Sequence, residues 1–111
     1  MQCILAAVAV GFFHTVVAGP PCSTWSKARF NLLFGGPRPL RTRSQPWGRT
    51  DINMSTAETR QLNIATKLLI NTLRIMTGIA KAGGTYILEH PRDPGGPPYP
   101  SIWDLPEVAA L

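Results

Sequence analysis

A long amphipathic segment, residues 55–82, constrains the fold of this chain most strongly. Ser55 and Glu58 form a capping box, in which each side chain satisfies a backbone N–H at the start of a helix. Gly83 and Gly84 end the pattern, and Lys81 in the last turn suits the helix dipole. The apolar spacing predicts a face formed by Leu62, Ala65, Leu69, Leu73, Met76 and Ala80 and widened by Ile64, Leu68, Ile75 and Ile79, so we expect the helix to lie against a sheet.

Apolar, β-branched runs flank this helix and predict strands over residues 12–18 and 85–89. A strand–helix–strand order predicts a parallel pair, and therefore an α/β fold. Parallel strands end at the same edge of a sheet. We therefore expect Cys22 and Glu89 to lie near each other, although 67 positions separate them.

The stretch Gly19-Pro20-Pro21-Cys22 ends the first strand abruptly, because proline cannot donate to a sheet ladder. A cysteine on a stiff turn that is followed by basic residues is a candidate nucleophile. The alternative is that Cys22 is a small buried hydrophobic residue, as most lone cysteines are.

The loop over residues 19–54 is rich in glycine, proline and arginine and shows no sustained periodicity. Residues 1–50 carry a net charge of +6 and residues 51–111 a net charge of −1. Either the loop is a solvated basic surface, or its arginines form a patch that contacts nucleic-acid phosphates. The candidate phosphate contacts are Arg29, Arg38, Arg41 and Arg43.

Two short motifs together resemble the cytosine-C5 DNA methyltransferases. Pro20-Pro21-Cys22 after a strand is similar to the catalytic loop of that family, and Tyr86–Pro91 resembles its second active-site element, a strand ending in Glu-Asn-Val or Glu-Asn-Pro. The resemblance covers most of residues 12–106. Gly36–Thr42, Pro46–Gly48 and Pro100–Trp103 also look like methylase-like segments of retroelement polyproteins. The resemblance implies part of a Rossmann-like methyltransferase sheet.

The resemblance also implies a chemistry. Cys22 would add to C6 of a cytosine flipped out of DNA, Glu89 would contact N3, and S-adenosylmethionine would be the methyl donor. His90 stands where the family has Asn, which puts the local geometry in question. In the alternative interpretation, Glu89 caps a loop or pairs with Arg92. The other residues expected to face the substrate or DNA are Pro21, Ser23, Ser26 and His90, together with the four loop arginines.

Several elements of that family have no counterpart in this sequence. The Gly-rich cofactor loop, the later Gln-x-Arg-x-Arg element and the target-recognition region are missing. We therefore expect residues 1–111 to be a single partial domain that does not methylate DNA alone, and whose partner is the missing remainder of a methyltransferase domain. It would then be a fragment, a retroelement remnant or one part of a split enzyme. The alternative is a non-catalytic basic module that binds nucleic acid.

The remaining segments indicate short or irregular elements. Residues 91–100 form a Pro-rich loop, and residues 101–111 a capped turn and a short helix. Residues 2–10 read as a short apolar helix or strand, too short to span a membrane. We expect an intracellular protein, nuclear if the source is eukaryotic; cleavage of a signal peptide after Ala18 is the alternative. With two cysteines, Cys3 and Cys22, and two distant histidines, no metal site is expected.

Overall fold

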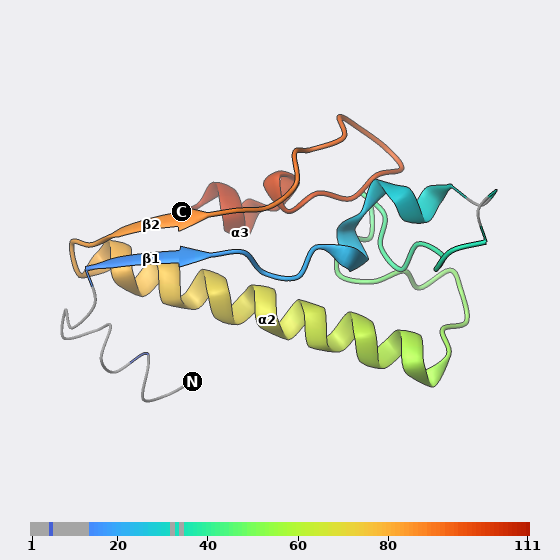
Figure 1. Ribbon diagram of the computed structural model, residues 1–111, viewed down its shortest axis with the longest axis horizontal. Helices are drawn as coiled ribbons and strands as arrows, with labels where there is room; N and C mark the ends of the chain where they lie inside the picture. Colours follow the sequence, from blue (N-terminus) through green and yellow to red (C-terminus); the bar gives the residue numbers. More distant parts are fainter. Residues whose placement is uncertain (1–4, 6–13, 32, 34) are drawn as a thin grey trace.

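The computed structural model describes Leu5, residues 14–31, Leu33 and residues 35–111. Within this part, a parallel pair of strands is joined by one long helix, so the predicted small α/β fold is confirmed (Figure 1). The sheet is not closed by further strands among the described residues. In chain order the elements are strand β1 (Thr15–Ala18), 3₁₀ turns at Ser23–Trp25 and Lys27–Phe30, helix α2 (Thr56–Lys81), strand β2 (Thr85–Leu88), a 3₁₀ turn at Ile102–Asp104 and helix α3 (Pro106–Ala109).

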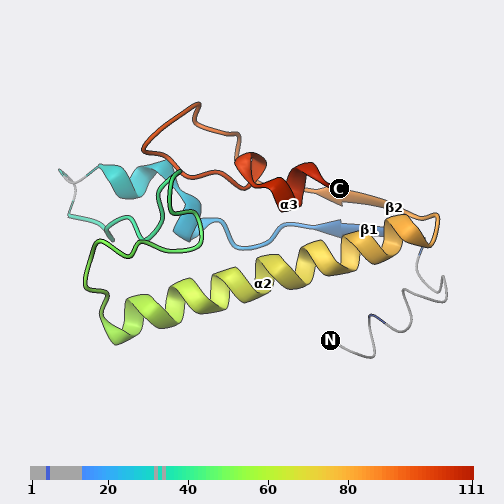
Figure 2. The same cartoon turned by 180° about the vertical axis from the view of Figure 1, so that it is seen from behind.

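The two strands run in register from Thr15 opposite Thr85 to Ala18 opposite Leu88. Both are shorter than the sequence predicted: β2 ends before Glu89, and residues 12 and 13 lie outside the described residues. Helix α2 lies along one face of this pair (Figures 1 and 2). On the strands themselves, Val17 is 67% exposed and its partner Ile87 is 58% exposed. Parallel sheets normally have both faces covered, so this apolar pair is left without cover by the described residues.

Helix α2 begins and ends where its caps predict. The Ser55 hydroxyl accepts the Glu58 N–H, and the Glu58 carboxylate accepts the Ser55 N–H, so the capping box is confirmed. At the other end, Gly83 has φ +83°, and a Cβ at Gly84 would lie 2.6 Å from the His14 carbonyl oxygen. Glycine is therefore required where the chain turns tightly from α2 back to the sheet.

The buried face of α2 differs from the predicted face at three positions. Ala80 is exposed, and Ile64 and Leu68 are 54% and 43% exposed, while Ile79 is buried as predicted. The helix is about 39 Å long at 1.5 Å per residue, whereas each strand has only four residues. The first half of α2 therefore extends past the sheet. There Leu62 lies against Gly48 of the loop, while Ile64 and Leu68 are left exposed. The buried residues of α2 are Leu62, Ala65, Leu69, Leu73, Met76 and Ile79.

The carboxyl-terminal part packs on α2 beside the end of β2. Ser101 caps the turn at Ile102–Asp104 by accepting the Trp103 N–H, and Pro106 opens α3, as predicted. The core cluster joins this part to α2 and to the turn after Cys22, and it comprises Trp25, Leu69, Leu73, Ile102, Leu105 and Val108.

The ion pair between Arg38 and Glu58 makes this fold less stable at acidic pH than at neutral pH. Hydrogen bonds from Arg38 lower the pKa of Glu58 to about 2 from 4.5. The pair therefore stabilises the fold above about pH 4.5, and this stabilisation is lost as the pH falls toward 2. The free energy of unfolding of the wild type, measured with urea, should fall between about pH 6 and pH 2.5. We expect a smaller fall in Glu58→Gln, because this variant has no carboxylate to protonate. An unchanged pH dependence would contradict the pairing, and Glu107→Gln is the matched control.

The predicted apolar segment over residues 2–10 and the alternative signal peptide fall largely outside the described residues. No described helix combines the length and the apolar composition needed to cross a bilayer.

Candidate active site

Cys22 lies four residues beyond β1, at the start of a 3₁₀ turn. Its carbonyl oxygen accepts the Trp25 N–H at 2.9 Å, which begins the 3₁₀ turn at Ser23–Trp25. The side chain of Cys22 is exposed and forms no disulfide within the described residues. The alternative that Cys22 is a buried core residue is therefore wrong, because the turn after the prolines leaves its thiol accessible.

Glu89 directly follows β2, so it lies at the same sheet edge. Its N–H donates to the Ala18 carbonyl oxygen at 2.9 Å, which extends the ladder by one bond. A Cβ built at Gly19 would lie 2.8 Å from Glu89 Oε2, so the carboxylate lies against the backbone just before the two prolines. Among the described residues, Glu89 makes no ion pair with Arg92. The β-α-β order thus places the Glu89 carboxylate three residues from Cys22 along the neighbouring chain segment.

Gly19 sets the position of the Glu89 carboxylate. The Cβ of Gly19→Ala would overlap Oε2, which is the mobile end of a side chain, so the carboxylate rather than the backbone would move. We expect this variant to keep its stability within about 1 kcal/mol while any chemistry that depends on Glu89 falls about tenfold or more. Urea unfolding and the exchange assay described below measure the two effects separately. Equal activity of Gly19→Ala and wild type would contradict this role.

Arg29 and Arg38, two of the predicted phosphate-binding arginines, hold the loop through hydrogen bonds to its backbone and to Glu58. Arg29 is 7% exposed and donates to the carbonyl oxygens of Ser23, at 2.7 Å, and Arg38, at 3.2 Å. Arg38 in turn donates to both carboxylate oxygens of Glu58, at 2.8 and 2.9 Å, and to the Asn53 carbonyl oxygen. The loop is thereby tied to the start of α2.

Arg41 is fully buried beneath Trp25. Its guanidinium donates to Thr24 Oγ1 at 3.0 Å, Thr66 Oγ1 at 2.9 Å and the Pro46 carbonyl oxygen at 2.8 Å. The guanidinium carbon lies 4.2 Å from the centroid of the Trp25 ring, a cation–π distance. Burial lowers the pKa of Arg41 to about 10, which still leaves it charged at neutral pH.

Arg43 joins the basic loop to the Pro-rich loop. It pairs with Asp93 and with Asp104, the latter at 3.0 Å, and it donates to the Tyr99 carbonyl oxygen at 3.1 Å. All four arginines thus have partners inside the chain and hold the backbone around Cys22. Their role as phosphate contacts stays a prediction, and Arg41 is the least accessible of them.

Cys22 also lines a recess of about 220 Å³ on the side of the Pro-rich loop. His90 lines the same recess, and burial lowers the pKa of this imidazole, so it is held neutral at pH 7. Of the other predicted site residues, Ser26 lines the recess, while Pro21 and Ser23 are exposed and do not. Glu89 does not line the recess either, so Cys22 lies between two environments: the Glu89 carboxylate at the sheet edge and the recess beside His90.

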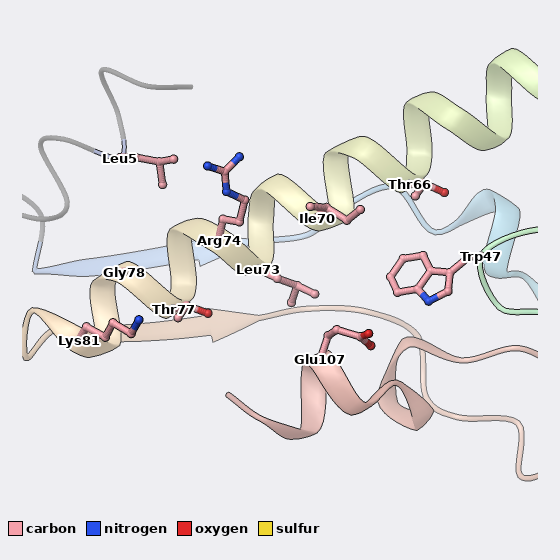
Figure 3. A pocket seen from close by; sticks show the side chains of 10 residues that line it. All are labelled: Leu5, Trp47, Thr66, Ile70, Leu73, Arg74, Thr77, Gly78, Lys81 and Glu107. Atoms are coloured by element: carbon pink, nitrogen blue, oxygen red, sulfur yellow. The ribbon is translucent and has the colours of Figure 1, made fainter.

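A larger cavity of about 880 Å³ runs along α2 between Trp47 and α3 (Figure 3). Its walls are mostly apolar, and the charged residues among them are Arg74, Lys81 and Glu107, which Figure 3 labels. Neither Cys22 nor Glu89 lines this cavity, so a methyl donor held there would not face them. The recess near Cys22 contains no carboxylate of the kind that often binds a ribose. The described residues therefore do not fit S-adenosylmethionine.

Metal binding finds no support in the part of the chain that the structure describes, because no three His, Cys, Asp or Glu side chains gather there.

Sequence reasoning named Gly19 only as part of the strand end and Arg92 only as an alternative partner of Glu89, and it assigned no site role to Lys27. The glycine before Pro-Pro was a visible signal of close backbone approach. The place of Lys27 and Arg92 in one recess depends on how the Pro-rich loop folds back, and no local pattern indicates it.

Comparison with known proteins adds no family: no family model matches the sequence, and no curated protein or solved structure matches it significantly.

Proposed function

We propose that the chain is a catalytic segment of the cytosine-C5 methyltransferase type, with Cys22 as nucleophile and Glu89 as the group that contacts cytosine N3. The observation that carries the proposal is the meeting of two chain segments at one sheet edge. Glu89 lies against Gly19, and the accessible thiol of Cys22 follows three residues later. Two stiff prolines and the braced turn after Cys22 hold this arrangement.

The residues of this chain supply the first half of the reaction. The Cys22 thiolate forms a bond from sulfur to C6, and the electron pair of the C5–C6 double bond moves into the ring. A hydrogen bond or proton from Glu89 to N3 compensates the charge that develops. The resulting enamine carries a nucleophilic C5. In a complete enzyme of this type, the missing remainder of the domain would hold S-adenosylmethionine, which would be the source of the methyl group.

The missing remainder of the domain is the proposed partner, with DNA as substrate. The exposed pair Val17 and Ile87 supports this, because an uncovered parallel pair is suited to adding further structure. The radius of gyration of 15.6 Å also exceeds the value of about 13 Å expected for a compact domain of this length. A partial Rossmann-like sheet accounts for both features. A nuclear or other intracellular location agrees with a DNA substrate and is part of the same proposal.

A test of the proposal must not depend on the methyl donor. After thiolate addition, the enamine can take a deuteron at C5 from D₂O; loss of the original C5 proton and expulsion of the thiolate then regenerate cytosine. We expect the chain to catalyse this C5 exchange in a cytosine-containing oligonucleotide, measured by mass spectrometry. A folded chain that gives no exchange above the rate without protein would contradict the proposal.

A non-catalytic nucleic-acid module is the competing candidate, and the basic recess beside Cys22 favours it specifically. It predicts binding of the same oligonucleotide without C5 exchange and without any dependence on Cys22.

A further inference from the structure

The recess beside Cys22 is lined by two cationic side chains and by no acidic residue. It has a volume of about 220 Å³ and lies between the turn after Cys22 and the Pro-rich loop. Its charged side chains are Lys27 and Arg92, both exposed and both positive. The nearest acidic residues in sequence, Glu89 and Asp93, do not line it. A recess with this lining attracts an anion.

Neither cation of the recess has an anionic partner among the described residues. Lys27 has its ammonium group 4.9 Å from the centroid of the Tyr99 ring and makes no ion pair there. Arg92 has neither an ion pair nor a side-chain hydrogen bond to any described residue. These two side chains differ from Arg38 and Arg43, which are paired with carboxylates. The recess therefore contains the cations near Cys22 that are available to an outside anion.

The neutral residues of the recess add further donors. Ser26 Oγ accepts the Ala28 N–H and Ser101 Oγ accepts the Trp103 N–H, so each hydroxyl proton is left for another acceptor. Trp25 is only 4% exposed, and its Nε1–H has no partner among the described residues. Buried donors of this kind are rarely left unsatisfied, and an indole N–H can only donate. The Nε1 atom has almost no accessible surface, so the Trp25 ring forms part of the wall without itself donating to an anion in the recess.

We propose that this recess is a binding site for a tetrahedral oxyanion of the phosphate type, held chiefly by Lys27 and Arg92. We assign this oxyanion to a backbone phosphate of a nucleic-acid strand, next to the base at Cys22. This assignment rests on the proposed function. The phosphate-binding role then belongs to Lys27 and Arg92, while the arginines at 29, 38, 41 and 43 hold the fold.

Titration with inorganic phosphate tests the site without any catalytic step. The readout is the indole N–H signal of Trp25 in ¹H–¹⁵N spectra, assigned by its loss in Trp25→Phe. We expect phosphate to shift this signal, and we expect Lys27→Gln and Arg92→Gln each to weaken binding about tenfold. Lys67→Gln and Arg60→Gln are matched controls, because they remove one positive charge from exposed positions on α2. They should change the affinity less than about twofold.

A binding curve that is the same in Lys27→Gln, Arg92→Gln and wild type would overturn the proposal, as would an unshifted Trp25 signal at about 50 mM phosphate. Both residues are exposed, so these variants are expected to fold, and the dispersion of the other amide signals verifies this in the same spectra.

A short DNA duplex tests the nucleic-acid source. If its backbone phosphate occupies the recess, Arg92→Gln should weaken duplex binding and reduce the slope of log K against log salt by about 1. If inorganic phosphate binds at the recess while duplex binding is unaffected by Arg92→Gln, the oxyanion site stands and its assignment to DNA is wrong. Loss of C5 exchange with intact phosphate binding would count against the proposed reaction alone.

Discussion

Cys22→Ser is expected to reduce C5 deuterium exchange by about 10³-fold or more, to the rate without protein. A serine hydroxyl is far less acidic than a thiol, so it does not supply the anionic nucleophile that adds to C6. The side chain of Cys22 is exposed, so we expect the free energy of unfolding to change by less than about 0.5 kcal/mol. Loss of exchange would then reflect the missing nucleophile and not a damaged fold.

Cys3→Ser is the matched control for this experiment, since it makes the same atomic change at the other cysteine. It should exchange at the wild-type rate. Exchange retained in Cys22→Ser and lost in Cys3→Ser would move the nucleophile to Cys3. Exchange retained in both variants would contradict the nucleophilic role proposed for Cys22, whereas exchange absent from the wild type as well would favour the non-catalytic module.

Arg41→Met is expected to destabilise the fold by about 3 kcal/mol. The substitution leaves Thr24 Oγ1, Thr66 Oγ1 and the Pro46 carbonyl oxygen without their donor, and it removes the stacking on Trp25. Hydrogen bonds to a charged group are worth about 1.5–3 kcal/mol each. Because Arg41 is buried without a carboxylate partner, removing its charge also relieves a desolvation penalty, which offsets part of the loss. The net effect is large for a chain of this size.

The measurement is urea unfolding of the wild type, Arg41→Met, Arg41→Lys and Arg49→Met at neutral pH. Lysine lacks the planar fork that reaches three acceptors, so Arg41→Lys should lose about 2 kcal/mol. Arg49 pairs with the exposed Asp51, and a surface pair of this kind contributes about 1 kcal/mol at most. If Arg41→Met is as stable as Arg49→Met, the buried arginine does not hold the loop, and the phosphate-binding role predicted for it becomes the better explanation.

The long helix and the order of elements were readable from the sequence, because they depend on local signals. The capping box at Ser55 and Glu58, the Gly83-Gly84 stop and the β-branched runs each act within a few residues. The parallel pairing then followed from the connection alone, since a helix of this length can return the chain in the same direction. The exposed Ile64 and Leu68 were misjudged because periodicity indicates an apolar face and does not indicate how far the sheet beneath it extends.

By itself the sequence determined the β-α-β order, and with it that Gly19 and Glu89 follow paired parallel strands and lie against each other. Only the tertiary structure decided what the basic loop does with its charges. The sequence pattern of these arginines is the same whether their side chains face solvent, a phosphate or other parts of the chain. Arg41 binds Thr66 on α2, and Arg43 binds Tyr99 in the Pro-rich loop and Asp104 in the following turn, up to 61 positions away. Charge pairing across such separations depends on how loops fold back, which no local propensity encodes.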